Sequence, residues 1–241
     1  MSDETKTFQE GRRAQGTEGL DFSTVMASAV HDMKNSLGML LHSLDELRQE
    51  IPDTVESSPR FNTLRYEAER VHGDLVQLLG LYRLDQDTLS AHIEEHFLPD
   101  YLEAQIARHI PLLEGHGLIH EVICEPVSGY FDADLLAGVI NNIVNNAIRY
   151  TRSRIRISAE ENEGFLVIRV ADDGSGYPDT MLEAASASSQ APIDFQSGST
   201  RLGLYFAEAV ARLHRDSDRV GEVRIHNGGT LGGGIFEIWL P

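Results

Sequence analysis

A histidine, an aspartate, a lysine and an asparagine stand within five consecutive positions of one predicted helix. The stretch is 29-AVHDMKNSLGMLL-41, with His31, Asp32, Lys34 and Asn35. Its apolar residues recur every three or four positions, and His31 lies about 200° around the helix from them, so we expect it to face water. A neutral imidazole with a carboxylate beside it and an amide one turn later suits a phosphoryl acceptor, although a solvated polar face would have the same composition.

Asparagines are concentrated in a second segment, 141-NNIVNNAIRYT-151. Asn142 and Asn146 are one helical turn apart, and Arg149 and Tyr150 follow them. Asparagine is a poor residue for helix interiors, so four of them within six residues carry a cost that indicates a use.

Two glycine-containing motifs come later in the chain. In 172-DDGSGYP-178, Asp172 can accept a hydrogen bond from an amino group, while Gly174 and Gly176 let the backbone approach a flat ring. In 198-GSTRLGLYFAEAVARLH-214, a turn rich in glycine and hydroxyl groups opens a helix whose free N–H groups suit phosphates. Either motif alone could be a simple turn or a helix cap. Their order and spacing after the asparagine segment are the stronger signal.

Two long helices must position His31. Apolar residues return about every 3.6 positions and predict one buried stripe made of Phe22, Met26, Ala29, Met33, Leu37, Leu40, Leu44, Leu47 and Ile51. After a break at residues 51–60, a second series alternates steps of three and four, as in a coiled-coil seam: Phe61, Leu64, Ala68, Val71, Leu75, Leu78 and Tyr82. A lone hairpin cannot cover both stripes, so we expect a homodimer that forms a four-helix bundle.

The rest of the chain alternates helical and extended patterns. Helices are expected at residues 98–114 and 133–149, and strands at residues 153–159, 165–172, 222–227 and 234–240. This pattern predicts an α/β sandwich with helices on one face of a mixed sheet, so the fold class of the whole chain is α+β. The predicted parts are a flexible arm (1–20), a dimerisation and phosphoacceptor domain (21–88) and a second domain (89–241), with a hinge at residues 85–93.

The composition limits the class of partner. The formal net charge is −18 and no dense run of lysine and arginine offsets it, which argues against binding to nucleic acid or anionic lipid. The single cysteine, Cys124, excludes a disulfide within the chain and suits a reducing compartment. The start lacks the pattern of a secretory signal, and no apolar run approaches the roughly 18 residues of a membrane span. We expect a cytoplasmic protein with protein or small-molecule partners.

In their order the motifs resemble those of the sensor histidine kinases of two-component signalling, over residues 22–241. The stretch 31-HDMKN-35 is similar to the phosphoacceptor box, 142-NIVNNAIRYT-151 to the N box, 172-DDGSG-176 to the G1 box and 202-LGL-204 to the core of the G2 box. The resemblance implies a Bergerat-type, GHKL-class ATP-binding fold in the second domain, with ATP and Mg²⁺ as cofactors. It also implies the receiver domain of a response regulator as partner, and input from a separate sensor protein is one source of signal.

The resemblance implies a role for each matching residue. His31 would take the γ-phosphoryl group of ATP, Asp32 would polarise it, and Asn35 would orient a water against the phosphorylated regulator. Asn146 would coordinate Mg²⁺ and Asp172 would accept a hydrogen bond from the adenine amino group. The remaining site residues would be Asn142, Arg149 and Tyr150 on the phosphate side and Gly174, Gly176, Arg201, Gly203 and Leu204 in the glycine boxes.

The sequence departs from the family pattern in three places. Ser36 stands where many of these kinases have proline, Arg201 stands where the G2 box typically has glycine, and residues 179–198 would form only a short lid. Arg201 could crowd the triphosphate or, as a cation, help to hold it.

Two hypotheses therefore remain open. One is an ATP-dependent protein-histidine kinase that passes its phosphoryl group to an aspartate of a response regulator and also acts as its phosphatase. The other is a phosphotransfer or scaffold protein with a degenerate nucleotide site, which docks a regulator without using ATP. The intact site residues favour the kinase: Asn142, Asn146, Asp172, Gly174 and Gly176.

Overall fold

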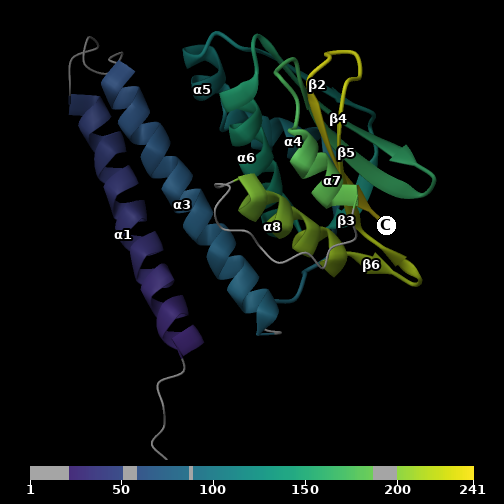
Figure 1. The fold of residues 1–241 in the computed structure, drawn as a ribbon, viewed down its shortest axis with the longest axis horizontal. Coiled ribbons are helices and arrows are strands. Elements are labelled where there is room, and N and C mark those ends of the chain that lie inside the picture. Colours follow the sequence, from purple (N-terminus) through teal and green to yellow (C-terminus); the bar gives the residue numbers. More distant parts are fainter. Residues whose placement is uncertain (1–21, 51–58, 87–88, 187–199) are drawn as a thin grey trace, which may run out of the picture.

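The computed structural model describes residues 22–50, 59–86, 89–186 and 200–241. Two long helices, α1 (Phe22–Glu50) and α3 (Pro59–Asp85), form a hairpin that lies beside a mixed α/β domain (Figure 1). The predicted N-terminal arm, part of the predicted hinge and most of the predicted lid lie outside the described residues. So does the side chain of Arg201.

The α/β domain is built on a five-stranded sheet in the order β2-β4-β5-β9-β8. Its strands are β2 (Ile119–Cys124), β4 (Arg154–Asn162), β5 (Phe165–Asp172), β8 (Glu222–Asn227) and β9 (Gly234–Leu240). Strand β2 runs parallel to β4, whereas the other neighbours are antiparallel, so the sheet is mixed as predicted. Two small antiparallel pairs accompany it: β1 (Glu94–Phe97) with β3 (Ser128–Phe131), and β6 (Arg215–Asp216) with β7 (Arg219–Val220).

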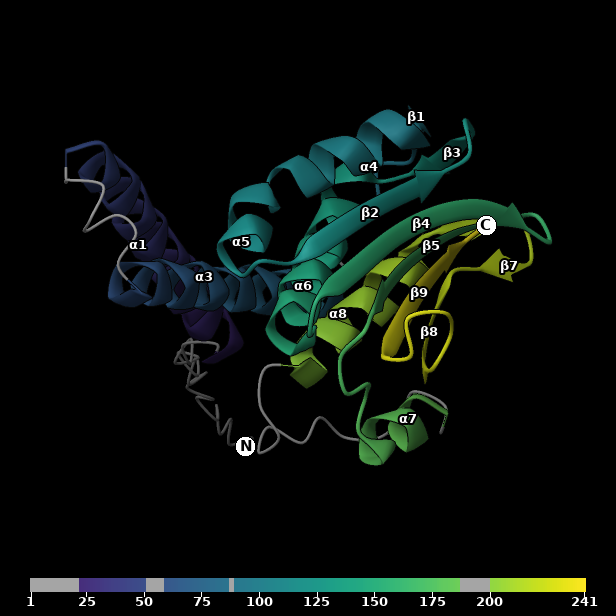
Figure 2. The same cartoon turned by 90° about the horizontal axis from the view of Figure 1, so that it is seen from above.

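Helices α4 (Leu98–Ala107), α6 (Ala133–Tyr150) and α8 (Thr200–Leu213) cover one face of the sheet (Figure 2). Two short helices, α5 (Ile110–Gly115) and α7 (Asp179–Ser186), lie near its ends. The single helix expected at residues 98–114 is in fact two, because Pro111 stands at the start of α5 and lacks the N–H that a continuous helix would need.

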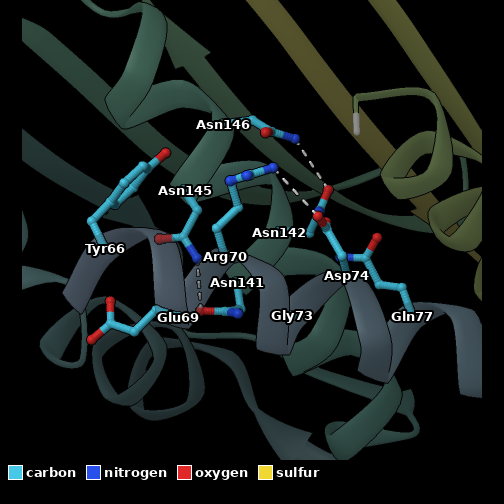
Figure 3. Close-up of a pocket in the computed structure, with 10 residues that line it drawn as sticks. All are labelled: Tyr66, Glu69, Arg70, Gly73, Asp74, Gln77, Asn141, Asn142, Asn145 and Asn146. Atoms are coloured by element: carbon cyan, nitrogen blue, oxygen red, sulfur yellow. Dashed lines mark hydrogen bonds and ion pairs between the residues drawn. The ribbon is translucent and has the colours of Figure 1, made fainter. Parts of the chain in front are cut away.

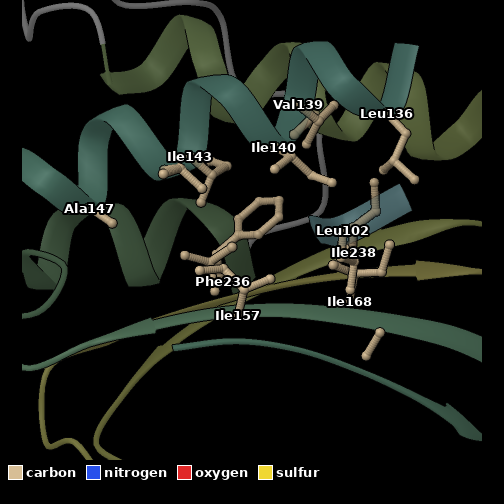
Figure 4. Close-up of a cluster of buried hydrophobic side chains, with 14 of the residues drawn as sticks. Leu102, Leu136, Val139, Ile140, Ile143, Ala147, Ile157, Ile168, Phe236 and Ile238 are labelled. Atoms are coloured by element: carbon tan, nitrogen blue, oxygen red, sulfur yellow. The ribbon is translucent and has the colours of Figure 1, made fainter. Parts of the chain in front are cut away.

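The core of the α/β domain forms between α6 and the sheet. Apolar side chains on one face of α6 pack against side chains of β4, β5 and β9 (Figure 4): Leu136, Val139, Ile140 and Ile143 against Ile157, Ile168, Phe236 and Ile238. All of these are nearly inaccessible to water. Because this face of α6 is fixed by burial, the asparagines on its other face are held in one orientation.

The hairpin buries only part of each predicted hydrophobic stripe within the single chain. Among the side chains of the two helices that the structure describes, the buried apolar ones are Val30, Leu44, Ala68 and Leu79. Three residues of each predicted stripe stay exposed in the single chain, in sets spaced by seven: Met33, Leu40 and Leu47 on α1, and Leu64, Val71 and Leu78 on α3. The stripe predicted for α1 is therefore buried only in part within the single chain. Steps of three and four cannot separate two neighbouring faces of one helix, and here only one face packs within the chain.

The described parts of the chain contain no helix long and apolar enough to cross a membrane. The cytoplasmic location expected from the sequence stays a prediction.

Two buried histidines join the helices of the α/β domain. His214 donates from Nδ1 to the Val210 carbonyl (2.8 Å), and its Nε2 accepts from the Asp132 backbone N–H (3.0 Å). Asp132 in turn caps α6 by accepting from the N–H groups of Asp134 and Leu135. Burial lowers the pKa of His214 and that of His109. Both histidines therefore stabilise the fold in their neutral form.

We expect acid to destabilise the fold through these histidines. A folded pKa below the unfolded value means that their contribution is complete above about pH 6.5 and is lost as the pH falls below it. Lowering the pH from about 7 to about 5 should reduce the melting temperature more in the wild type than in His214→Gln, which cannot be charged. Calorimetric melts of the two proteins would test this, and parallel curves would contradict it.

Candidate active site

A cavity of about 290 Å³ lies between α6, the end of β5, α7 and the start of α8. Its polar lining includes Asn146 and Tyr150 of α6, Asp172 at the end of β5 and the loop Ser175–Pro178. Apolar side chains form the other walls: Ile143, Ala147, Val170, Met181 and Leu204. A mostly apolar cleft with a few fixed polar groups is the usual form of a site for a small organic ligand.

Asp172 is oriented by the backbone around it. Its Oδ1 accepts from the N–H of Gly174 (2.7 Å) and from the N–H of Gly234 on β9 (3.2 Å). Its Oδ2 has no hydrogen-bond partner among the described residues. The carboxylate, which lines the cavity, thus keeps one free acceptor oxygen that suits an amino group on a flat ring.

Two glycines are required by close approach to this carboxylate. A side chain at Gly174 would overlap the Tyr150 carbonyl at the end of α6, and one at Gly233 would overlap the Asp172 carbonyl. The G1-like loop therefore rests directly on the end of the asparagine helix and on the turn between β8 and β9. Any larger residue at either position would push Asp172 out of place.

The neighbouring carboxylate, Asp173, is structural. It accepts from the N–H groups of Arg152, Ser153 and Arg154 and from the Ser153 hydroxyl, at 2.6–3.1 Å. The cost of partial burial favours its neutral form, but these hydrogen bonds outweigh that cost and hold the pKa of Asp173 well below its usual range. It anchors the start of β4 to the end of β5.

Asn142 and Asn146 form a hydrogen-bonded pair one turn apart on α6. The Nδ2 of Asn146 donates to Oδ1 of Asn142 at 3.2 Å. Gly203, buried in α8, faces this pair, and a side chain there would overlap the Asn142 amide. Gly203 therefore lets α8 approach α6, and its neighbour Leu204 lines the cavity.

The two residues that follow the asparagines diverge. Tyr150 is half exposed and lines the cavity. Arg149 points instead to the hairpin, where its Nε donates to the Tyr66 hydroxyl (3.1 Å) and its guanidinium lies 5.6 Å from the centre of the Tyr66 ring. In this arrangement Arg149 is not among the residues that line the cavity.

Helix α3 packs against the asparagine face of α6. Figure 3 shows Arg70, paired with Asp74, opposite Asn142 and Asn146. The small pocket between them, about 30 Å³, has room for one water, and the buried Oε1 of Gln77 facing it has no partner among the described residues. Further along, Gly80 of α3 lets Phe206 of α8 approach, since a side chain there would come within 2.8 Å of the ring.

The phosphoacceptor-like cluster lies on α1, apart from this cavity. The side chain of His31 is 49% exposed, as the sequence predicted. Its Nδ1 lies 3.5 Å from Asp32 Oδ1 and 3.3 Å from Asn35 Nδ2. Its Nε2 has no partner among the described residues, so this nitrogen is accessible to a phosphoryl donor. Helix α3 lies between α1 and the α/β domain (Figure 1).

Two residues of the site are not among those predicted from the sequence. Tyr177 lines the cavity, and burial together with the nearby charge of Asp172 raises the pKa of its phenol. Asn227, at the end of β8, bonds to the Tyr177 backbone through both ends of its amide. Tyr177 follows the G1-like motif directly and could have been included. Asn227 is 50 residues further on, in an ordinary turn sequence, and only the sheet brings it there.

The part of the chain that forms the cavity matches a known protein family. Residues 131–241, which contain every residue named around the cavity, match the family model of the histidine kinase-, DNA gyrase B- and HSP90-like ATPases. They form an ATPase domain of this kind.

The chain as a whole is homologous to sensor histidine kinases. The adaptive-response sensory kinase SasA of Synechococcus sp. (strain JA-2-3B'a(2-13)) is 26% identical over all of this chain and 65% of its own length. The sensor protein kinase WalK of Staphylococcus aureus is 23% identical over 78% of this chain and 48% of its own length. The chain thus spans less than two thirds of either relative.

Solved structures of histidine kinases share the fold. The histidine kinase AdeS of Acinetobacter baumannii has a TM-score of 0.57 at 19% identity, covering 87% of this chain and 96% of that one. The catalytic domain of the histidine kinase ThkA has a TM-score of 0.53 at 19% identity, covering 62% of this chain and 97% of that one. The predicted fold class, with its helical region, ATPase domain and mixed sheet, is confirmed.

Proposed function

We propose that the protein is an ATP-dependent protein-histidine kinase that phosphorylates His31 and passes the phosphoryl group to an aspartate of a response-regulator receiver domain. The observation that carries the proposal is the free Oδ2 of Asp172, together with Asn146 in the lining of the same cavity. A base would bind at the Asp172 side, and phosphates would extend toward the asparagines and the start of α8. The alternative, a phosphotransfer or scaffold protein that does not use ATP, gives no reason for this arrangement.

The residues fit a Mg²⁺ ion at the asparagine side. The Oδ1 of Asn146 accepts no hydrogen bond from the described residues, and hard cations prefer such oxygen ligands. The Asn142 amide, held against Gly203, fixes the rotamer of Asn146. A bound Mg²⁺ would neutralise charge on the phosphates.

His31 would be the nucleophile. The lone pair of Nε2 would attack the γ-phosphorus of ATP in the tautomer that carries its proton on Nδ1, facing Asp32. Because the Nδ2 of Asn35 can only donate and lies 3.3 Å from Nδ1, the Asn35 amide would have to turn away in that tautomer. The bond from that phosphorus to the bridging oxygen breaks, ADP leaves, and Asp32 accepts the Nδ1 proton as positive charge develops on the ring. Asn35 would orient a water molecule for hydrolysis of the phosphorylated aspartate of the regulator. The protein would then act as the phosphatase of the regulator as well.

Transfer to His31 requires the ATPase domain to move relative to the hairpin. Helix α3 now contacts α8 and the asparagine face of α6, so His31 cannot meet a nucleotide in the cavity directly. The hinge predicted at residues 85–93 would allow that movement, and the contact between Arg149 and Tyr66 would have to break.

A second copy of the chain would cover the exposed apolar face of the hairpin. The heptad-spaced sets on α1 and α3 are each about half exposed in the single chain, and burying them between two hairpins would complete a four-helix bundle. We therefore keep the homodimer as part of the proposal. A separate sensor protein would be one source of input, beside the N-terminal arm and further domains.

Labelling from ATP tests the proposed function. The full chain incubated with ATP labelled in the γ position and Mg²⁺ should become labelled, and EDTA should slow labelling by at least about 100-fold because the charge of the triphosphate would be uncompensated. Absence of labelling together with absence of ATP binding by calorimetry would favour the alternative.

A further inference from the structure

The amide of Asn227 clamps the loop that follows Asp172. Its Oδ1 accepts from the Tyr177 backbone N–H at 2.7 Å, and its Nδ2 donates to the Tyr177 carbonyl at 2.8 Å. One side chain thus satisfies both backbone groups of one residue, as a neighbouring strand would. Tyr177 is in this way tied to the end of β8, where Asn227 pairs with Gly234 of β9.

The loop is closed tightly over this amide. Gly176 has a positive φ of 78°, and a side chain there would come within 2.6 Å of Asn227 Oδ1. On the other side, the Tyr177 ring lies against Gly234, whose N–H also bonds to Asp172. The clamp and the Asp172 carboxylate are therefore held by the same pair of strands.

Few side chains could replace this amide. Two simultaneous bonds to one backbone unit need a donor and an acceptor in a single plane, which an amide provides. A carboxylate keeps the acceptor but would face the Tyr177 carbonyl with a second acceptor. With alanine at this position, the Tyr177 N–H and carbonyl would have only water as hydrogen-bond partner.

We propose that Asn227 is a positioning residue for nucleotide binding, which holds Tyr177 and the loop from Gly174 to Tyr177 as the wall against which the base packs. This inference rests on the proposed ATP site. Because the clamp lies at the Asp172 side of the cavity and not at the asparagine side, it acts on the base and ribose and not on the phosphates. Loss of the clamp should weaken the binding of adenosine and of ATP by the same factor.

Calorimetric titration of the full chain with ATP and with adenosine tests the inference. Asn227→Ala should bind both about tenfold more weakly, the effect of losing about two solvent-exposed hydrogen bonds. Asn162→Ala is the matched control, because Asn162 ends β4 at the opposite end of the sheet, where it pairs with Phe165. It should bind both ligands as the wild type does.

Two further measurements separate positioning from a general loss of structure. The melting temperature without nucleotide should change by less than about 3 °C in Asn227→Ala. Hydrogen exchange in the peptide that contains Tyr177 should become about tenfold faster, while exchange in α6 stays unchanged. Asn227→Asp, which keeps one of the two bonds, should behave as Asn227→Ala does if the donor is required.

The outcomes are distinguishable. If the wild type binds ATP and Asn227→Ala binds ATP and adenosine equally well, only the inference is overturned. A loss of affinity confined to ATP also overturns it. So does a loss of affinity accompanied by a large fall in melting temperature in both Asn227→Ala and Asn227→Asp. If the wild type binds neither ligand, the proposed function itself fails.

Discussion

Replacing Asn146 with alanine should abolish labelling from ATP while leaving His31 able to accept a phosphoryl group from a phosphorylated regulator. The forward rate should fall by at least about 100-fold, because the alanine removes the oxygen proposed to hold the charge-neutralising ion at the phosphates. The reverse transfer needs only the hairpin and the regulator. Since Asn146 is only half-buried and lies outside the apolar core, we expect the fold to survive.

Asn145→Ala is the matched control for this prediction. Asn145 is the adjacent asparagine on α6, but it faces α3 and bonds to Asn141 rather than lining the cavity. Labelling by Asn145→Ala should stay within about threefold of the wild type. Comparable losses in both variants, or labelling that persists in Asn146→Ala, would contradict the role given to Asn146. Rates measured with γ-labelled ATP, and with a phosphorylated receiver domain as donor, would decide.

Gly203→Ala should also weaken ATP binding, through a steric effect. The added methyl group would overlap the Asn142 amide and force either α8 or the pair of asparagines to move. Overpacking of this kind costs about 1–3 kcal/mol, and here the displaced groups belong to the site, so we expect ATP affinity to fall by at least about tenfold.

Gly73→Ala provides the comparison, because it makes the same change in the interior of a helix without a clash. Nothing lies within 4 Å of the position that the methyl group would occupy. Helix propensity then predicts a gain of up to about 1 kcal/mol in the free energy of unfolding, with ATP affinity unchanged. Calorimetric titrations and melts of both variants would test the pair. Normal ATP affinity in Gly203→Ala would show that the contact with Asn142 is unimportant.

The sequence predicted the elements of the ATPase domain well where one face of an element is buried. The helix that carries Asn142 and Asn146 and the four predicted strands agree with the structure to within a few residues. Each has a strong apolar period set by the core. Strand β2 was missed; it lies at the edge of the sheet, and two of its isoleucines stay exposed, so no buried face marks it.

Contacts between segments far apart in the chain could not be predicted from the periodicity and motifs within each segment. Nothing near Arg149 in the sequence indicates that it will meet Tyr66, 83 residues earlier. The clamp by Asn227 depends in the same way on the sheet order, which brings the end of β8 beside the loop after β5. In the hairpin, the repeat identified both helices, but it could not separate the apolar residues that pack within the chain from those that stay exposed in it, because both sets share one period.

Whether His31 carries the phosphoryl group is tested most directly by the chemistry of the label in wild type and His31→Gln after incubation with γ-labelled ATP and Mg²⁺. A phosphoryl group on the imidazole of His31 should survive alkali and be lost in acid, and His31→Gln should carry no label. Label that survives acid, or that persists in His31→Gln, would contradict the assignment.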